Sequence, residues 1–258
     1  MAENLFLPKT IEYQPDKENK NKGTVVITPC YPGYGTTLGS ALRRVLLSSL
    51  AGVAIDAVKI KGARHEFGTL PGIKEDLLEI ILNLKAVRFK PKVELPSPLV
   101  LEFKTQKEGI VKAREILTGP EVEVVNPNLK IAEITDKKAS LGMKLWLAKG
   151  YGWVSADEKS REGREEGTII IDSIFNPVFK VAPQIENVRV GKRNDYEKLS
   201  LVIETDSTLS PLEAFLKAVD LLAEEFTFLK KGGEKLLGVK KETTKKIKKK
   251  VVKTKKEK

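Results

Sequence analysis

The 258-residue sequence has very few of the side chains from which most metal and redox sites are built. It contains one cysteine, Cys30, and one histidine, His65. A single cysteine excludes an internal disulfide and a cysteine-based zinc cluster, and it is typical of proteins in a reducing compartment. His65 has neither a nucleophile motif nor a set of metal-ligating side chains beside it, so we interpret it as a structural or interface residue.

Long apolar runs are also missing. No run approaches the roughly 20 residues that a membrane-spanning helix requires. The first residues, Met1 to Pro8, lack the basic start and the apolar segment of a secretion signal. Apolar residues still make up 41% of the chain, which is enough to bury a core. We therefore expect a cytoplasmic protein that makes no contact with a membrane.

The sequence lacks complete phosphate-binding and nucleophile motifs. The stretch Gly33-x-Gly35-x3-Gly39 has the outline of a dinucleotide-binding turn, but its third glycine comes one residue late. Pro29 and Pro32 also interrupt the link from strand to helix. Neither a P-loop nor a nucleophile elbow occurs. A nucleotide-dependent enzyme is an alternative class, but we expect no catalytic residue, cofactor-binding residue or metal ligand in this chain.

Positive charge is abundant but concentrated at the C-terminal end. The net charge is +11, and residues 239–258 account for +9 of it with eleven lysines and two glutamates. The other 238 residues carry only +2, which argues against the alternative of a basic nucleic-acid-binding module such as a ribosome-associated protein. We expect the lysine run to be disordered, serving either as a solubilising tail or as a nonspecific DNA-binding tail. The candidate DNA contacts are Lys245, Lys246, Lys248, Lys249 and Lys250.

The stretch from Pro32 to Leu50 is the strongest local pattern. A glycine-broken turn leads into a helix predicted over residues 36–50, with a hydroxyl of Thr36 or Thr37 capping its start. Apolar side chains recur with the spacing of one helix face, at Leu38, Ala41, Leu42, Val45, Leu46 and Leu50. The opposite face carries Ser40, Arg43, Arg44, Leu47 and Ser48. That face is either a solvated surface with one stray leucine or a protein interface, because interfaces are enriched in arginine and apolar anchors.

A second long helix has a clear start. Ser210-Pro211-Leu212-Glu213 combines an N-cap serine, a proline at the first helical position and a glutamate at the third. We predict that this helix ends at Gly232-Gly233 and that its apolar residues cover a wide arc. Such a helix either packs on both its own domain and a partner or lies at the centre of a core.

Most of the remaining sequence favours strands. The β-branched run at 24–28 and the apolar residues at 55–60 predict two strands, the second covered on both faces. Between residues 91 and 191 short β-rich runs alternate with turn residues, and residues 156–167 predict a mobile loop. A short helix is expected at 75–85. The predicted fold class is therefore α+β.

Several separate motifs, in the right order, resemble the amino-terminal portion of the bacterial RNA polymerase alpha subunit. The longest is GYGTTLGSALRRVLLSS, from Gly33 to Ser49. The others are His65-Glu66-Phe67, two stretches within residues 71–85, the segment from Val188 to Leu199 and the helix from Ser210 to Leu229. The resemblance covers the chain from about Leu5 to Phe228.

The resemblance implies two domains. A discontinuous α+β dimerisation domain would comprise residues 1–53 and 178–238, and an inserted, mainly β domain would comprise residues 54–177. The basic tail expected to be disordered, residues 239–258, would follow them. Two copies would dimerise through the helices at 36–50 and 211–231. The implied dimer contacts are Leu38, Leu42, Leu46, Leu50, Phe215, Val219, Leu222 and Phe226.

The same resemblance implies partners and an activity. The dimer would bind the beta and beta-prime subunits, with omega and sigma joining the complete enzyme, and DNA would be contacted through that complex. Magnesium-dependent nucleotidyl transfer would reside in the large subunits. The family's carboxy-terminal DNA-binding domain is expected to be missing, because the lysine run stands at the linker position. The implied large-subunit contacts are Arg43, Arg44, Leu47, Ser48, Lys85, Asp172 and Ser173.

Overall fold

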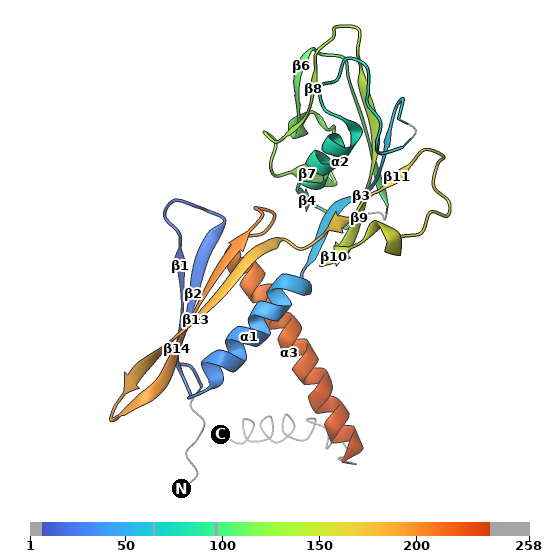
Figure 1. The fold of residues 1–258 in the computed structure, drawn as a ribbon. Helices are drawn as coiled ribbons and strands as arrows, with labels where there is room; N and C mark the ends of the chain where they lie inside the picture. Colours follow the sequence, from blue (N-terminus) through green and yellow to red (C-terminus); the bar gives the residue numbers. More distant parts are fainter. Residues whose placement is uncertain (1–6, 64, 96–97, 238–258) are drawn as a thin grey trace, which may run out of the picture. The chain divides into compact units, whose positions relative to one another are not determined.

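The computed structural model describes residues 7–63, 65–95 and 98–237. The described residues form α-helices and antiparallel sheets that follow one another without regular alternation (Figure 1), which confirms the α+β class. The chain divides into two compact units, of which the first ends at Val219 and the second begins at Asp220. The lysine run of residues 239–258, with its five candidate DNA contacts, lies outside the described residues.

One sheet of the first unit joins strands from distant parts of the sequence. Its four strands are antiparallel and lie in the order β1-β2-β14-β13. The central pair therefore brings a strand from the beginning of the chain beside one that follows residue 190. The strand bounds are β1 (Thr10–Pro15), β2 (Lys22–Cys30), β13 (Val178–Val190) and β14 (Arg193–Thr205).

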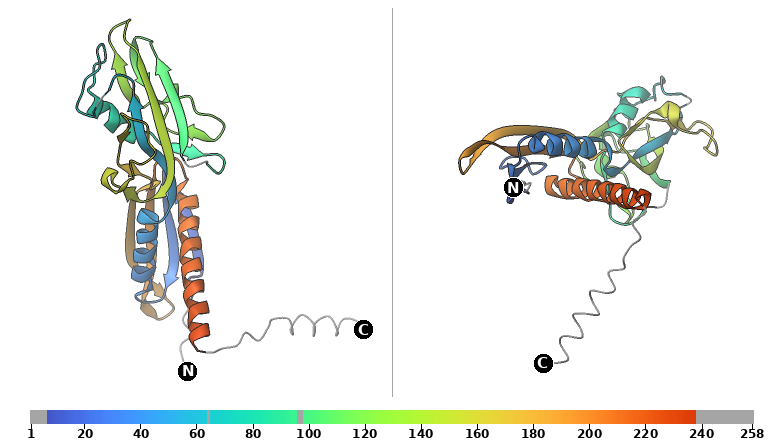
Figure 2. Two further views of the ribbon diagram at one scale, coloured as in Figure 1. Left: turned by 90° about the vertical axis from the view of Figure 1, so that its right-hand side faces the viewer. Right: turned by 90° about the horizontal axis from the view of Figure 1, so that it is seen from below.

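Helix α1 (Tyr34–Ser48) packs against β13 and β14, as Figure 2 shows. Gly39 permits this close approach, because a Cβ there would lie 3.0 Å from Cδ1 of Leu199 and 3.2 Å from Cβ of Pro183. Leu42 and Leu46 are buried. The apolar stripe predicted from the sequence is therefore the face that covers the sheet.

The start of α1 differs from the prediction. The helix follows Gly33, which has a left-handed backbone (φ 82°), and no side chain of the cap residue satisfies the first turn. Glu197 of β14 instead accepts hydrogen bonds from the N–H groups of Gly33 (3.0 Å) and Gly35 (2.8 Å). Thr37 donates its hydroxyl to the carbonyl of Gly33, so the predicted threonine cap was wrong. The capping group comes from a strand that only folding brings to this turn.

A second, six-stranded sheet is formed by the segment between α1 and β13. Its strand order is β5-β9-β3-β4-β7, and β11 also pairs with β3. Nearly all of β3 is buried, which confirms that both its faces are covered. The strand bounds are β3 (Ala51–Ile60), β4 (Phe89–Pro91), β5 (Leu99–Thr105), β7 (Val122–Val124), β9 (Leu141–Tyr151) and β11 (Ile169–Ile170).

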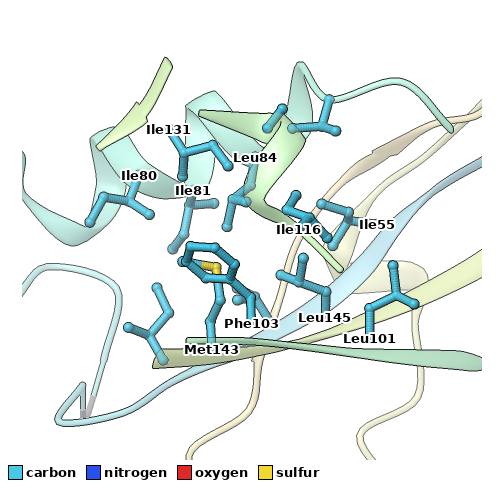
Figure 3. Packing of buried hydrophobic residues seen from close by; sticks show 14 of the residues in the cluster. Ile55, Ile80, Ile81, Leu84, Leu101, Phe103, Ile116, Ile131, Met143 and Leu145 are labelled. Atoms are coloured by element: carbon cyan, nitrogen blue, oxygen red, sulfur yellow. The ribbon is translucent and has the colours of Figure 1, made fainter. Parts of the chain in front are cut away.

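Shorter elements complete this part of the chain. Helix α2 (Leu77–Lys85) begins after Asp76, whose carboxylate accepts a hydrogen bond from the N–H of Glu79 at 2.7 Å. In Figure 3 its apolar face meets the buried side chains of the sheet. Two further strand pairs and two single turns of helix are β6 (Gly109–Lys112) with β8 (Lys130–Ile134), β10 (Trp153–Val154) with β12 (Ser173–Ile174), η1 (Ala113–Glu115) and η2 (Ala156–Glu158).

Helix α3 (Pro211–Leu236) begins as predicted but ends later. The N–H of Glu213 donates to Oγ of Ser210 at 3.2 Å, and the N–H of Ser210 donates to Oε2 of Glu213 at 2.9 Å, which is a capping box. The helix continues through Gly232 and Gly233, so the predicted end was wrong. A glycine weakens a helix by about 1 kcal/mol without ending it when the neighbouring residues favour helix.

Candidate interaction surfaces

The polar side of α1 is a charged surface. Arg43, Arg44 and Ser48 are exposed and Leu47 is half-buried. The hydroxyl of Ser48 donates to the carbonyl of Arg44 at 2.8 Å, so it is partly satisfied within the helix. The two guanidinium groups therefore remain the main polar groups that this face offers to a partner.

An apolar surface runs along α3. Its large side chains alternate between covered and open positions at the start of the helix, where Phe215 is buried and Leu216 is exposed. Further along, Phe226 is 65% exposed and Phe228 is 73% exposed. The exposed residues on one side of the helix, here called the α3 apolar face, are Leu212, Leu216, Val219, Phe226 and Leu229, whereas Phe228 lies on the opposite side.

The eight expected dimer contacts fall into two groups. Leu42, Leu46, Leu50 and Phe215 are buried within the chain itself, where they fill its own core. The other four keep accessible surface, and they are Leu38, Val219, Leu222 and Phe226. In the folded chain, only this second group and the rest of the α3 apolar face are accessible to another molecule.

A second charged surface lies where α2 ends. Lys85 Nζ is 2.9 Å from Oδ2 of Asp172, and the other carboxylate oxygen accepts the N–H of Ala156 at 3.0 Å. The hydrogen bond from Lys85, followed by the one from Ala156, holds the pKa of Asp172 below its usual value. Both side chains are partly exposed, so the pair can be approached from outside.

Ser173, also expected at this surface, is 1% exposed. Its hydroxyl donates to the carbonyl of Ile55 at 2.7 Å and accepts a hydrogen bond from Lys159 Nζ at 2.6 Å. The residue is thus held inside β12, and its two hydrogen bonds fix the backbone next to Asp172.

Asp56 organises the polar contacts beneath this surface. Its carboxylate binds Lys159 at 3.0 Å and also pairs with Arg164. The side chains of Asp56 and Lys159 are only 12% and 7% exposed. Burial would raise the pKa of Asp56, but the hydrogen bonds from Arg164 and Lys159 hold that pKa below its usual value. Both basic residues come from the segment at 156–167, which these ion pairs tie to β3.

Sequence reasoning did not identify this network. The available signal was a carboxylate, Asp56, inside an apolar strand, followed much later by a loop rich in lysine and arginine. A buried carboxylate requires a cationic or hydrogen-bonding partner. That rule alone predicts a partner for Asp56, but it does not say which of the many basic residues supplies it.

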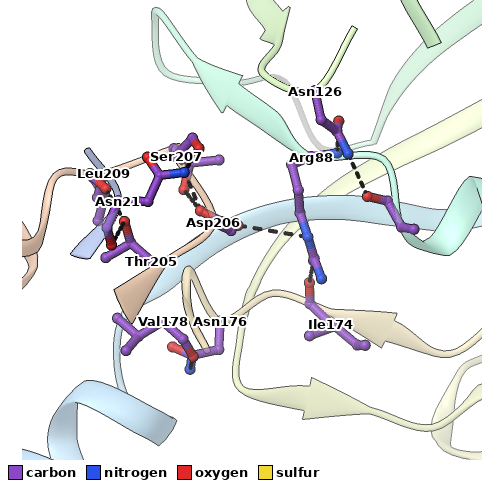
Figure 4. Close-up of polar contacts among 12 residues, drawn as sticks. Asn21, Arg88, Asn126, Ile174, Asn176, Val178, Thr205, Asp206, Ser207 and Leu209 are labelled. Carbon is purple, nitrogen blue, oxygen red and sulfur yellow. Dashed lines mark hydrogen bonds and ion pairs between the residues drawn. The ribbon is translucent and has the colours of Figure 1, made fainter. Parts of the chain in front are cut away.

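A third polar cluster joins the end of β14 to the start of β4 (Figure 4). Arg88 Nε lies 3.8 Å from Oδ2 of Asp206, and its Nη1 donates to the carbonyl of Ile174 at 3.1 Å. The guanidinium group also lies 5.2 Å from the centre of the Phe179 ring. Burial raises the pKa of Asp206 in spite of hydrogen bonds from Thr208 and the nearby Arg88 charge. Burial likewise lowers the pKa of Arg88.

The described residues hold no group of three or more His, Cys, Asp or Glu side chains that could bind a metal ion. His65 is exposed and Cys30 is buried. In the same part of the chain, no helix is long and apolar enough to cross a membrane.

Comparison with known proteins shows which family the sequence resembles. Residues 58–176 match the model of the RNA polymerase Rpb3/RpoA insert domain. The chain is 44% identical over 202 residues to the DNA-directed RNA polymerase subunit alpha of Moorella thermoacetica, covering 78% of this chain and 64% of that protein. It is 42% identical over 214 residues to the same subunit of Desulfitobacterium hafniense, covering 83% and 67%.

A third relative shows the same relationship over a longer span. The subunit alpha of Carboxydothermus hydrogenoformans is 41% identical over 226 residues, which are 88% of this chain and 71% of that protein. The chain thus spans about two thirds of the length of the curated relatives that it matches. Identity at this level over this length establishes descent from a common ancestor, and the chain belongs to the family of bacterial DNA-directed RNA polymerase alpha subunits.

Proposed function

We propose that two copies of this chain associate and that the dimer gathers the beta and beta-prime subunits of DNA-directed RNA polymerase. The chain would contribute assembly and not chemistry, since magnesium-dependent nucleotidyl transfer would take place in the large subunits. Omega and sigma would join the complete enzyme, and DNA would be bound through that complex in the cytoplasm. The relatives are named as subunits of this polymerase, which supports the proposal.

The observation that carries the proposal is the α3 apolar face. Soluble proteins rarely leave a long series of large apolar side chains in contact with water, and such surfaces usually mark binding sites. A two-fold contact would bury the same face of both copies at once. Burial of apolar surface contributes roughly 25 cal/mol per Å². A contact of this kind therefore provides the driving force for dimerisation.

The charged surfaces supply the second step. A dimer holds two copies of the Arg43–Arg44 face and two copies of the Lys85–Asp172 pair in fixed relative positions. Arginine is enriched among the residues that dominate binding energy at protein interfaces. We infer that one copy of the chain meets beta through these groups and that the other copy meets beta-prime. Dimerisation would thus precede capture of the large subunits.

The dimer step is tested by placing charges on the α3 apolar face. Leu216→Glu combined with Phe226→Glu should convert the dimer into a monomer, because two desolvated carboxylates would have no partners. Light scattering coupled to size-exclusion chromatography measures the mass of the protein. Lys217→Glu changes an exposed polar position of the same helix and should leave the dimer intact. A wild-type chain that stays monomeric at high concentration would contradict the proposal.

The capture step is tested by Arg44→Ala. The variant should remain a dimer, because Arg44 is exposed on the face of α1 that does not pack on the sheet. Its affinity for the beta subunit should fall by about 1 to 2 kcal/mol, as is typical for an important interface arginine. Affinity is measured by titrating immobilised beta with the dimer. If Arg44→Ala yields a monomer, the assignment of the two faces of α1 is wrong.

A further inference from the structure

We propose that the solvent-facing side of the β5–β9–β3 sheet binds an acidic protein segment in which a carboxylate lies next to an apolar side chain. The binding site is a groove of about 520 Å³ whose lining includes Lys61, Lys104, Gly142 and Leu117. Neither Lys85 nor Asp172 lines this groove. The proposed site is therefore separate from the surface assigned to the large subunits and does not depend on that assignment.

In one row of residues across these strands, the lysines form ion pairs with carboxylates of the same chain. Glu102, Lys144 and Lys59 face one another in register on β5, β9 and β3. Neighbouring like charges on adjacent strands repel each other. Glu165 relieves the repulsion by binding both lysines, at 2.9 Å from Lys59 Nζ and 3.3 Å from Lys144 Nζ, while Glu102 is 3.4 Å from Lys144 Nζ. One carboxylate placed over this row thus bridges two ammonium groups.

The next row has the same cations without a carboxylate. Lys104 is in register with Gly142, and the carbonyl of Gly142 accepts the N–H of Lys61 at 2.8 Å. A Cβ on Gly142 would lie 3.8 Å from Cβ of Lys61 and 4.0 Å from Cγ of Lys104, so the two lysine stems flank the glycine. Among the described residues, neither Lys61 nor Lys104 has an ion-pair partner. A carboxylate from another molecule, placed above Gly142, would pair with Lys61 and Lys104 as Glu165 pairs with Lys59 and Lys144.

The groove also has an apolar side, which sets the chemistry of the ligand. Leu117 is 77% exposed and lines the groove, whereas Phe103 and Met143, which also line it, are only 3% and 4% exposed. An apolar side chain next to the bound carboxylate would cover Leu117 and remove both surfaces from water. A nucleic acid fits less well, because its backbone requires a longer track of unpaired cations than two lysines provide. The groove therefore favours an acidic peptide.

The test uses the purified full chain and a fluorescein-labelled nine-residue peptide of alternating glutamate and leucine. Fluorescence anisotropy at low ionic strength should show binding. The double variant Lys61→Gln/Lys104→Gln should bind about tenfold more weakly, since two exposed charge contacts are lost. Lys180→Gln/Lys192→Gln removes the same charge from two exposed lysines outside the groove and should bind like the wild type. An unchanged affinity in the first variant, or an equal loss in the second, overturns the proposal.

Two further comparisons separate charge from shape. Gly142→Val fills the space between the lysine stems without changing the charge, and Leu117→Ser removes the apolar contact, so both should weaken binding. A peptide with glutamine in place of glutamate should lose at least as much affinity as the double lysine variant. Circular dichroism confirms that each variant is folded. Tighter binding of a ten-nucleotide oligothymidylate than of the peptide would assign the groove to nucleic acid and overturn the proposal.

Discussion

At the scale of single residues, Asp56 is a largely buried carboxylate that pairs with two basic side chains, Lys159 and Arg164. It holds Lys159, which in turn binds the hydroxyl of Ser173, the residue that precedes Ile174 and follows Asp172. A surface that binds a partner requires its charged groups at fixed positions. The partly exposed pair Lys85–Asp172 is therefore held in place from below by a buried ion pair, Asp56–Lys159.

We predict that Asp56→Asn lowers the free energy of unfolding by about 3 kcal/mol. Removing one partner leaves the ammonium group of Lys159 buried without a counter-charge, which is costly. Chemical denaturation measures the loss. Glu186→Gln breaks a comparable but exposed pair with Lys198 and should cost less than about 1 kcal/mol. Equal losses in the two variants would show that burial does not matter at Asp56.

The same residue predicts a pH dependence. Ion pairing holds the pKa of Asp56 below the reference value of 3.8, so the unfolded chain binds this proton more readily than the folded chain. The stabilisation is therefore fully present above pH 3.8 and is lost as the pH falls through the folded-state pKa. Below pH 3.8 the stability difference between wild type and Asp56→Asn should become smaller. Denaturation curves recorded at several acidic pH values test this sign.

At the scale of elements, α3 shows how far local pattern carries a prediction. The capping box at Ser210 and Glu213 fixed the start of the helix, because its two hydrogen bonds are formed by residues three apart. The predicted end of α3 was wrong, because two consecutive glycines do not by themselves end a helix, and α3 continues to Leu236. The α1 cap failed for a different reason, since Glu197 lies in another strand and no local pattern connects it to Gly33. Local sequence patterns thus locate the helices and strands. The contacts between residues distant in sequence, such as the cap that Glu197 provides for α1, are visible only in the folded structure.

For the candidate interaction surfaces too, local sequence patterns predicted some features, and others depend on residues distant in sequence. Sequence periodicity separated the exposed Arg43 and Arg44 from the buried Leu42 and Leu46, because helix spacing alone decides which face is which. Burial of Ser173 could not be predicted in this way, since it depends on Lys159 and the carbonyl of Ile55. The strand order β1-β2-β14-β13 also escapes local reasoning, because it pairs segments from opposite ends of the first unit.

We predict that Gly232→Ala combined with Gly233→Ala stabilises the end of α3. Both glycines lie within the helix, and a Cβ at either position would meet nothing within 4 Å. Alanine is favoured over glycine in a helix by about 1 kcal/mol per residue. Circular dichroism should show more helix near the melting temperature and a higher melting temperature. Lower helix content would mean that this part of the chain leaves the helical conformation in solution.

At the scale of the whole first unit, Arg88 and Asp206 connect segments that belong to different sheets. Arg88 precedes Phe89 at the start of β4, and Asp206 follows Thr205 at the end of β14. Both side chains are largely buried, so each depends on the other for compensation. The ion pair therefore links the end of β14 in one sheet to the start of β4 in the other, so that a change at either residue affects the stability of both segments.

We predict that Arg88→Met destabilises the protein by about 3 kcal/mol at neutral pH, because the carboxylate of Asp206 is left buried without its counter-charge. The pKa of Asp206 is already above 3.8 in the folded state, so protonation favours folding as the pH falls from neutrality towards 3.8. The loss caused by Arg88→Met should therefore shrink over that range. The double variant Arg88→Met/Asp206→Asn, which has no buried charge, should recover much of the stability at neutral pH. Calorimetry at several pH values measures each case.

The contact between Glu197 and the first turn of α1 has a consequence for how this protein is made. The two partners Gly35 and Glu197 are 162 positions apart, so a ribosome synthesises the turn long before the carboxylate that completes it. The strands that cover the apolar stripe of α1, β13 and β14, are also translated late. During that interval the apolar side of α1 is not yet covered by β13 and β14. Exposed apolar segments of this kind are bound by chaperones. Translation must pass Thr205 before the first sheet can close.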